Sequence, residues 1–217
     1  MDNILVFGET EQEHDSRLKQ VLRRLKGSEL TLNKEKCQFK VTSVEFLRHT
    51  VTSEGISASS DKVKAVAEMK APTNSKELKR LLGMVDYMRK FNPKLAEVES
   101  PMRKLLKQKY SWLWGPDQEE AFFNVKELLT TFPTLVKFEV EKKHRITADA
   151  SKHSLGAALL QKEEIGWLPV SYASRTMTET EQRYAQIEKE ALAVTWACQK
   201  FDFFLVGRTF LIETDRC

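Results

Sequence analysis

The alternation of apolar and polar residues predicts a pair of short strands between residues 144 and 161. Ile146, Ala148 and Ala150 alternate with polar residues, which is the period of a strand that is buried on one face. A polar turn with a glycine follows, and then a second apolar run. Asp149 lies near the end of the first strand, where a carboxylate is costly unless a metal, another cation or water compensates it. A turn-forming aspartate is the ordinary alternative.

A stretch with helical periodicity follows, and a further strand comes after it. Between Thr178 and Leu205 the apolar spacing predicts one amphipathic helix. Its core-facing stripe is expected to contain Ile187, Ala191, Val194, Cys198, Phe201 and Leu205. On a wheel of about 100° per residue, Glu190 lies about 40° from Val194, on the flank of that stripe. The strand predicted after the helix ends in Asp215.

Strand, helix and strand are therefore expected to bring Asp149, Glu190 and Asp215 together at one end of a sheet. Carboxylates gathered that closely repel one another, so the arrangement is stable only around cations. Hard oxygen ligands without a cysteine or histidine cluster favour Mg²⁺ or Mn²⁺ over zinc. Two such ions can activate a water and stabilise the leaving oxygen in phosphodiester cleavage.

The residues before this sheet predict a mixture of strands and helices. Helices are expected to begin near Thr10, Asp61, Asn74, Pro101 and Asp117, and strands to cover 1–8, 30–32, 37–39 and 44–51. Trp112 and Trp114 are expected to anchor the loop before the last of these helices to a core. Stacking of these two side chains on nucleic-acid bases is the alternative.

Composition narrows the class of protein. The chain has 217 residues, enough for one or two domains, and 30% of them are charged. No apolar run approaches 18 residues and no signal peptide is present, so we expect an intracellular protein, cytoplasmic or nuclear, without a membrane partner. Cys37, Cys198 and Cys217 are scattered, which is typical of reduced thiols and not of structural zinc.

Positive charge is concentrated in one helical region. Residues 61–109 contain 13 lysines and arginines and six acids, a local charge of +7 in a chain whose net charge is +4. A basic helical bundle can follow nucleic-acid phosphates, with an affinity that falls as salt rises. The candidate contacts are Lys79, Arg80, Arg89, Lys90, Arg103 and Lys104. An ordinary solvated helix surface is the alternative.

Five sequence blocks in order resemble the ribonuclease H domain of gypsy-type long-terminal-repeat retrotransposons. They are residues 148–151, 154–157, 170–174, 188–194 and 213–215. The resemblance implies that Asp149, Glu190 and Asp215 are catalytic and are three of four acids that hold two Mg²⁺ ions. The family's fourth acid has no counterpart before Cys217, and Arg216 stands where the family usually has histidine.

The first half of the chain resembles the reverse transcriptase of the same elements. The opening residues resemble the end of its catalytic motif, with Asp2 as a remnant metal ligand of the polymerase site and Asn3 in place of the second acid. Residues 36–39 and 45–56 resemble the late palm, although Arg48 stands where the family usually has glycine. The resemblance to the thumb rests on residues 71–74, 81–91 and 101–106.

This resemblance implies a fold that is α+β and α/β. It consists of a palm hairpin remnant, a three-helix thumb and a mixed-sheet ribonuclease H-like domain truncated after its fourth strand. The implied domains are 1–58 (C-terminal part of the palm), 59–110 (helical thumb), 111–142 (tether) and 143–217 (N-terminal part of the ribonuclease H-like domain).

The implied function is that of a reverse transcriptase–ribonuclease H fragment that binds an RNA–DNA hybrid or another duplex. In the complete protein, DNA would be synthesised and the RNA strand hydrolysed by two-metal catalysis. Fingers and palm are expected upstream, and the rest of the nuclease and an integrase downstream. We expect this chain alone to be inactive. A non-catalytic nucleic-acid-binding remnant of a decayed or co-opted element stays open as the alternative. The thumb-like region argues against a third possibility, an integrase-type nuclease.

Overall fold

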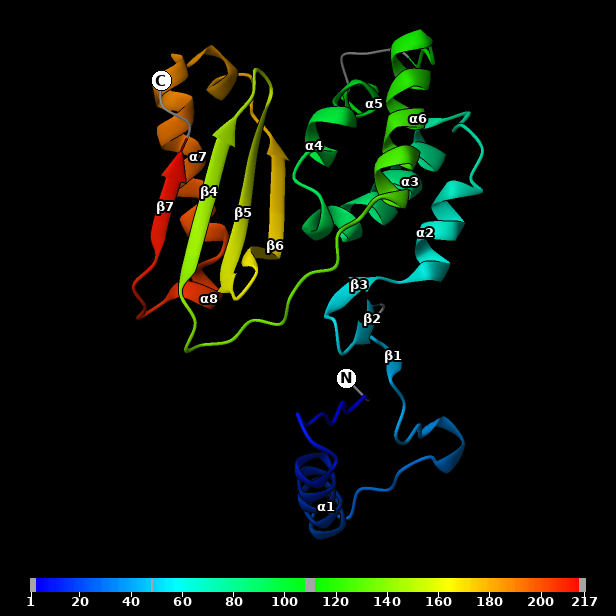
Figure 1. Ribbon diagram of the computed structural model, residues 1–217. Helices are drawn as coiled ribbons and strands as arrows, with labels where there is room; N and C mark the ends of the chain where they lie inside the picture. The colour runs from blue at the N-terminus through cyan, green and yellow to red at the C-terminus, as the bar shows by residue number, and fades with distance from the viewer. Residues whose placement is uncertain (1–2, 48, 108–111, 215–217) are drawn as a thin grey trace. The chain divides into compact units, whose positions relative to one another are not determined.

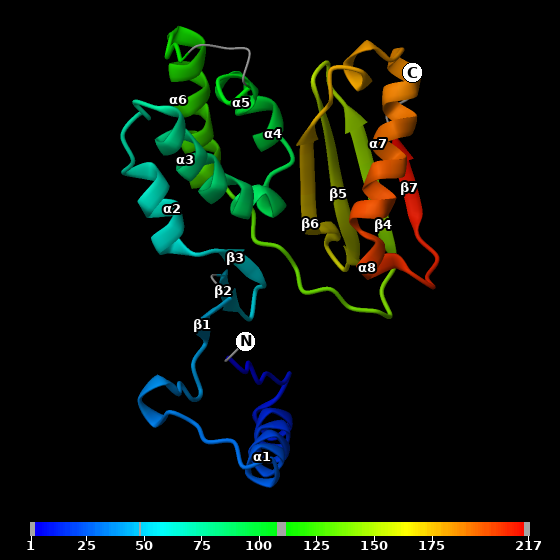
Figure 2. The same ribbon diagram turned by 180° about the vertical axis from the view of Figure 1, so that it is seen from behind.

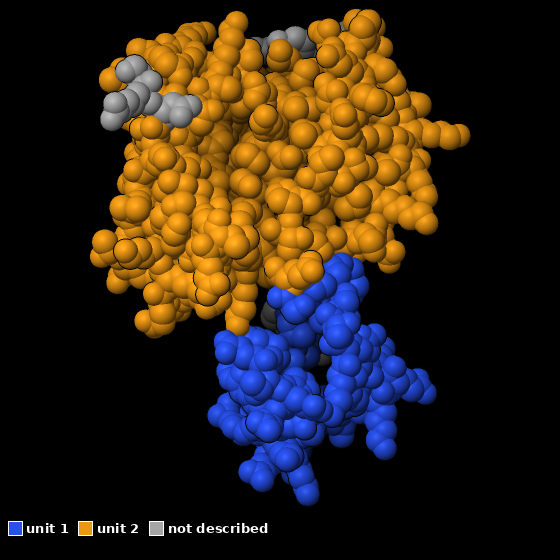
Figure 3. All heavy atoms as spheres, in the orientation of Figure 1, with its two compact units in different colours: residues 1–53 blue, residues 54–217 orange. Residues whose placement is uncertain are grey.

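A computed structural model describes residues 3–47, 49–107 and 112–214. The chain forms two compact units, residues 1–53 and residues 54–217, which Figure 3 colours separately. Among the described residues, none of the helices combines the length and the apolar character that crossing a bilayer requires.

The first unit begins with helix α1, Glu11–Gly27. Its N-terminus is capped reciprocally, because Thr10 Oγ1 accepts from the Glu13 backbone N–H at 3.2 Å and the Glu13 carboxylate accepts from the Glu9 N–H at 2.8 Å. The 3₁₀ helix η1 and an antiparallel hairpin follow. Their bounds are Lys34–Lys36 for η1, Ser43–Phe46 for β1 and His49–Thr52 for β2.

Three strand predictions in this unit are wrong for the residues that the structure describes. Residues 30–32 and 37–39 form no strand, because left-handed backbone at Glu29 and Lys40 interrupts the extended chain and η1 separates the two stretches. Residues 3–8 likewise form no strand.

The second unit opens with a helical part. Its elements are β3 (Ile56–Ala58), α2 (Ser60–Ala67), α3 (Ser75–Met88), η2 (Arg89–Phe91), α4 (Leu95–Val98), α5 (Ser100–Lys104) and α6 (Pro116–Thr130). As predicted, Asn74 caps α3 by accepting from the Glu77 N–H at 2.9 Å. The helix expected from Pro101 is shorter than predicted, and α4 precedes it. The described residues of 59–110 thus hold four α-helices instead of three.

A hydrophobic core joins these helices to the loop around β3. It includes Leu78, Leu81 and Leu82 of α3, as predicted, and Trp112 and Trp114 pack against it. The predicted anchoring role of the two tryptophans is therefore confirmed.

The start of β3 is held against the segment after α6. The Ile56 N–H donates to the Leu135 carbonyl at 2.7 Å. Gly55 has a φ of +141°, and a Cβ there would lie 2.2 Å from the same Leu135 oxygen. Only glycine fits this close approach.

A four-stranded mixed sheet forms the rest of the second unit (Figures 1 and 2). Its strands are β4 (His144–Ala150), β5 (Ser154–Glu163), β6 (Gly166–Thr176) and β7 (Leu211–Thr214), in the order β6-β5-β4-β7. The pairs β4–β5 and β5–β6 are antiparallel, and β7 is parallel to β4. This sheet confirms the predicted fold class.

Helix α7, Gln186–Lys200, packs on one face of the sheet over a second hydrophobic core. The single helix predicted from 178 to 205 is wrong. The structure has the 3₁₀ helix η3 (Glu181–Arg183), an extended link, α7, and then α8 (Asp202–Leu205). The predicted stripe is also wrong at Ile187, which is 68% exposed, and at Ala191, which is exposed, whereas Ala193 and Ala197 are buried. Two small alanines, and not the bulkier Ile187, face the sheet and allow the helix to lie close to it.

The helical part of this unit contacts the sheet directly. The Arg89 guanidinium donates to the Ser174 carbonyl on β6 at 3.0 Å, and the Ser174 hydroxyl accepts from the Ala96 N–H at 3.4 Å. Elements η2 and α4 thus pack against β6, which fixes the groove described below between the two parts.

Candidate functional site

Strand β4 presents Asp149 to solvent near its C-terminal end. The side chains of Ala148 and Ala150 are buried, and Asp149 between them is exposed. The residue that pairs with Asp149 on β5 is Gly156. A Cβ at Gly156 would lie 3.7 Å from the Cβ of Pro93, so Pro93 covers the position opposite Asp149.

Glu190 is the fifth residue of α7 and lies close to this end of β4. The Gln186 side-chain amide donates to the Ala150 carbonyl at 3.0 Å and to Glu190 Oε1 at 2.6 Å. This amide therefore ties the start of the helix to the end of the strand. As a result, Glu190 and Asp149 belong to elements that meet at the same end of the sheet.

The neighbouring Glu188 has a different role. Its carboxylate accepts from the Ala185 backbone N–H at 2.8 Å, which is half of a capping box at the start of α7. Glu188 thus stabilises the helix terminus. It provides an acidic control residue two positions from Glu190.

The second carboxylate oxygen of Glu190 is buried and accepts no hydrogen bond from any described residue. A buried carboxylate oxygen without a donor is unfavourable unless a cation compensates it. Carboxylate oxygens are the ligands that Mg²⁺ and Mn²⁺ prefer. The Glu190 side chain therefore fits a divalent cation.

Strand β7 pairs with β4, and the last pair joins Ala148 to Thr214. The predicted ligand Asp215 is the next residue in the sequence. Asp215 and Asp2 both lie outside the described residues. Within the part of the chain that the structure describes, no three acidic, histidine or cysteine side chains come together as a metal cluster.

Two of the basic candidates form a buried ion cluster. Arg89 pairs with Asp86 and Glu99, and Arg103 pairs with the same two acids, its Nε lying 2.8 Å from Glu99 Oε1. The Glu99 side chain is fully buried. Burial raises the pKa of its carboxyl, and the two arginines oppose that rise. The cluster joins η2, α3 and α5.

The other basic candidates differ in exposure. Lys79 and Arg80 are exposed on α3, and Lys104 is exposed on α5. Lys90 is half-buried, and burial lowers the pKa of its ammonium group. Its Nζ lies 5.1 Å from the centre of the Phe91 ring. Roles for these residues in nucleic-acid binding stay predictions.

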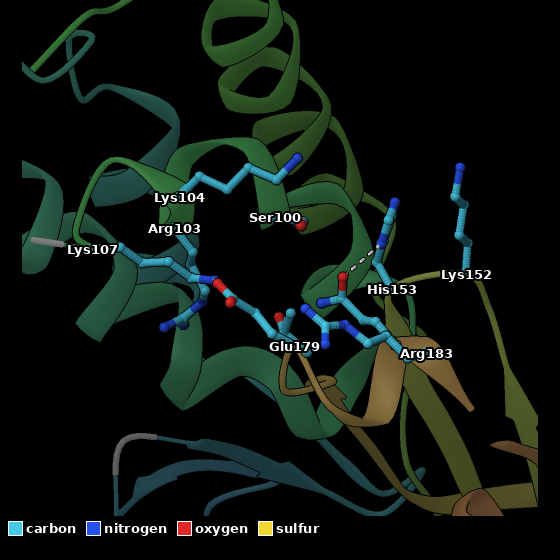
Figure 4. A pocket seen from close by; sticks show the side chains of 10 residues that line it. Ser100, Arg103, Lys104, Lys107, Lys152, His153, Glu179 and Arg183 are labelled. Carbon is cyan, nitrogen blue, oxygen red and sulfur yellow. Dashed lines mark hydrogen bonds and ion pairs between the residues drawn. The ribbon is translucent and has the colours of Figure 1, made fainter. Parts of the chain in front are cut away.

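A basic groove of about 460 Å³ lies between α5 and the sheet end (Figure 4). The helical part contributes Ser100, Arg103, Lys104 and Lys107, and the β4–β5 turn, β6 and the η3 region contribute Lys152, His153, Thr176, Glu179, Gln182 and Arg183. Lys107 and Glu179 form an ion pair of 3.1 Å between the two sides.

The sequence prediction omitted Lys152, Arg183 and Gln186. A turn of polar residues and a 3₁₀ helix give no periodic signal that distinguishes functional from solvated lysines and arginines. The signal that was available was their position in the sequence. Lys152 follows Asp149 by three residues, and Gln186 and Arg183 precede Glu190 by four and seven residues.

Two family models match the chain. Residues 1–51 match the model described as reverse transcriptase (RNA-dependent DNA polymerase). Residues 114–212 match the model described as the RNase H-like domain found in reverse transcriptase. These matches favour the predicted resemblance over an integrase-type nuclease.

Curated relatives extend the match to almost the whole chain. The Transposon Tf2-7 and Tf2-3 polyproteins of Schizosaccharomyces pombe are each 35% identical to it over 218 residues. The alignment covers 99% of this chain and 16% of each polyprotein. The chain therefore spans about a sixth of the length of these relatives.

Solved structures share the fold. A foamy viral protease-reverse transcriptase dRH in complex with double-stranded DNA matches with a TM-score of 0.85 and 22% identity, over 96% of this chain and 37% of that one. The foamy viral protease-reverse transcriptase in complex with an RNA/DNA hybrid matches with a TM-score of 0.83 and 22% identity, over 96% and 28% of the two chains.

Proposed function

Because the chain belongs to the reverse transcriptase and ribonuclease H region of gypsy-type retrotransposon polyproteins, we propose that it binds an RNA–DNA hybrid and contributes carboxylates for hydrolysis of the RNA strand. The observation that carries this proposal is the buried Oε2 of Glu190, which has no hydrogen-bond partner among the described residues. It lies on the helix that Gln186 ties to the end of β4 beside Asp149. The structural relative that is complexed with an RNA/DNA hybrid supports the choice of substrate.

Asp149, Glu190 and Asp215 would hold Mg²⁺ or Mn²⁺, two ions in the complete nuclease. When bound, the ions supply an activated water and stabilisation of the leaving oxygen. The chain's own contribution is to position the ligands. Gln186 fixes one oxygen of Glu190, the other oxygen accepts no hydrogen bond from a described residue, and Asp149 is exposed near the end of β4.

DNA synthesis is proposed only for the longer polyprotein. Residues 1–51 match a reverse transcriptase model, and Asp2 would be a remnant ligand of the polymerase metal site. Asn3 removes one negative charge next to it. Fingers and palm upstream, and the rest of the nuclease and an integrase downstream, would complete the activities.

A second candidate is nucleic-acid binding without catalysis, in a decayed or co-opted element. Asn3 at the polymerase motif and Arg216 after the third acid both favour it. The two candidates agree on hybrid binding and differ on the metal. In the first, Glu190 and Asp149 bind Mn²⁺ in the chain as it stands; in the second they do not.

The test measures Mn²⁺ binding by electron paramagnetic resonance in the presence of hybrid. We expect Asp149→Asn and Glu190→Gln each to weaken binding at least tenfold, because each removes a charged ligand. Glu188→Gln, the capping residue two positions away, should leave metal binding unchanged. An equal effect of all three variants, or Mn²⁺ binding that survives in both site variants, would contradict the metal site.

Two further readouts separate the candidates. Without metal, Glu190→Gln should raise the melting temperature, because it removes the negative charge from a side chain whose buried Oε2 has no hydrogen-bond partner among the described residues. With Mg²⁺, the chain alone is expected to cut a labelled hybrid negligibly. Robust cutting that disappears in Asp149→Asn would instead show that three acids suffice for turnover. Wild-type chain that binds hybrid but no Mn²⁺ would support the non-catalytic candidate.

A further inference from the structure

The basic groove between α5 and the end of the sheet carries positive charge that is only partly neutralised. Its ten lining residues include five lysines and arginines and one carboxylate, that of Glu179. The cations come from three separate places: α5 and the residues after it, the β4–β5 turn, and η3. Cations from distant segments repel one another, so their convergence has an electrostatic cost unless an anion is present.

Some of this charge is already paired. Arg103 is paired with Glu99 and Asp86, and Lys107 with Glu179. The remaining three cations, Lys104, Lys152 and Arg183, have no ion pair with any described residue. They belong to α5, the β4–β5 turn and η3, and thus lie on both sides of the groove (Figure 4).

The groove is also lined by the polar side chains of Thr176 and His153. Thr176 lines it, and the Thr176 Oγ1 is buried without a hydrogen-bond partner among the described residues. His153 is oriented by Gln182: the Gln182 amide nitrogen donates to the Met177 carbonyl at 2.9 Å, so its oxygen is turned toward His153 Nδ1 at 3.3 Å. Nδ1 then carries the hydrogen of that bond, and Nε2 is an acceptor nitrogen in this tautomer, so the charge contacts to an anion come from the lysines and arginines.

We propose that this groove binds the phosphodiester backbone of a nucleic acid, with Lys104, Lys152 and Arg183 as its main charge contacts. The inference rests on the proposed function and adds a location for the substrate strand. Lys152 follows Asp149 by three residues, and Arg183 precedes Gln186 by three. A backbone held in the groove therefore passes beside the end of β4 and the start of α7, where the candidate metal ligands lie.

A nucleic-acid backbone fits these contacts better than a single small anion. Charge contacts come from both walls of a groove of about 460 Å³, and Arg183 adds planar donors suited to phosphate oxygens. A row of phosphates satisfies separated cations at once, whereas one phosphate ion satisfies only those that it touches. Binding of inorganic phosphate alone is thus an outcome that would overturn the proposal.

The experiment measures hybrid binding by fluorescence anisotropy, with the full chain in EDTA so that no metal contributes. The variant is Lys152→Gln with Arg183→Gln. Its matched control is Lys143→Gln with Lys200→Gln, two exposed lysines: Lys143 directly precedes β4, and Lys200 is the last residue of α7. Each phosphate contact that is lost should reduce the slope of log affinity against log salt by about 0.7–0.9. We expect a slope smaller by about 1.5 and a five- to twentyfold weaker affinity near 100 mM salt, with the control unchanged.

A substitution with the opposite effect sharpens the test. Glu179→Gln removes the single carboxylate among the lining residues and releases Lys107. It should tighten hybrid binding about two- to fivefold. A structural role of Glu179 alone would not increase affinity.

The outcomes distinguish this inference from the proposed function. Hybrid binding that is equally strong and equally salt-sensitive in wild type, groove variant and control overturns the groove and leaves the proposed function intact. No hybrid binding by the wild type overturns both. Competition by inorganic phosphate at millimolar concentration, with no difference between the groove variant and the control on hybrid, assigns the groove to a free anion. A selective loss in the groove variant with a gain in Glu179→Gln supports the nucleic-acid backbone.

Discussion

The two compact units differ in what holds them together. In the described part of residues 1–53 no side chain is buried, and the apolar face of α1 includes Leu22, which is 39% exposed. Residues 54–217 contain two hydrophobic cores, one among the helices and one between α7 and the sheet. Since burial of apolar surface is the main stabilising contribution to folding, almost all of the stability of the chain is expected in the second unit.

The difference also concerns polar contacts. Ion pairs of the first unit are exposed, as in Lys40 with Glu11, whose side chains are 64% and 71% exposed. In the second unit, Arg89 and Glu99 are 17% and 0% exposed. The same kind of bond is therefore screened by water in one unit and held away from it in the other. The candidate functional residues that the structure describes all belong to the second unit.

The largest expected effect separates the two units by a matched pair of substitutions. Leu159→Ala removes a fully buried side chain from β5 and should lower the free energy of unfolding by about 2–5 kcal/mol. Leu22→Ala in α1 should change it by no more than about 0.5 kcal/mol, because the leucine is already partly in water. Urea denaturation followed by far-ultraviolet circular dichroism measures both. Equal losses of unfolding free energy in the two variants would show that Leu22 is buried in a core. The two units would then not differ in hydrophobic stabilisation.

A smaller effect is expected from the buried ions. Arg89→Met leaves the buried Glu99 with one fewer cation and removes the bond to the Ser174 carbonyl, which should cost about 3 kcal/mol at neutral pH. Lys40→Met, which breaks an exposed pair in the first unit, should leave the unfolding free energy unchanged. Thermal unfolding of both variants at pH 7 measures the contrast.

The pH dependence of the Arg89→Met effect tests whether the loss of stability comes from the charge of Glu99. Burial already raises the pKa of the Glu99 carboxyl, and loss of the Arg89 charge raises it further. Below that raised pKa, Glu99 is neutral in the folded protein and no longer needs the arginine. The cost of the substitution should therefore shrink as the pH falls. A cost that is the same at pH 4 and pH 7 would assign it to lost packing instead of charge.

Local patterns predicted the capped helices α1 and α3 and the strand β4, and failed for the short strands of the first unit and the long helix from 178 to 205. The cap at Asn74 and the apolar stripe along α3 could be predicted because each depends only on residues that are close together in the sequence. The same holds for β4 with Asp149 exposed between buried alanines. In the first unit, the short apolar runs at 30–32 and 37–39 pair with no described strand, so these residues form no β-sheet despite their alternating pattern.

Contacts between residues that are far apart in the sequence determine the features that local patterns did not predict. The buried side of α7 depends on the sheet beneath it, which selects Ala193 and Ala197 over the larger Ile187. A count of charges treats Arg89 as a free cation, whereas Glu99, ten residues later, pairs with it. The groove likewise joins residues about 50–80 positions apart, and no spacing in the sequence indicates that.

The smallest predicted effect concerns Glu181, the first residue of η3. The Arg175 guanidinium donates to both Glu181 oxygens at 2.8 Å and, with the Thr178 N–H, lowers the carboxyl pKa from 4.5 to about 2. A depressed pKa means that the bond contributes fully above pH 4.5 and is lost as the pH falls toward 2. Because the pair is partly exposed, we expect Glu181→Gln to cost about 1 kcal/mol at pH 7.

That cost should become smaller at pH 3 and vanish only below the pKa of about 2, where the wild-type carboxyl is protonated as well. Denaturant titrations of wild type and Glu181→Gln at pH 7, 4 and 3 measure the decline. Glu11→Gln, in the exposed pair of the first unit, is the control and should leave the acid limb of the stability profile unchanged. If Glu11→Gln flattens the acid limb as much as Glu181→Gln does, exposed and sheltered ion pairs contribute alike. The electrostatic half of the contrast between the two units would then be wrong, whereas the hydrophobic half, which Leu159 and Leu22 test, would stand.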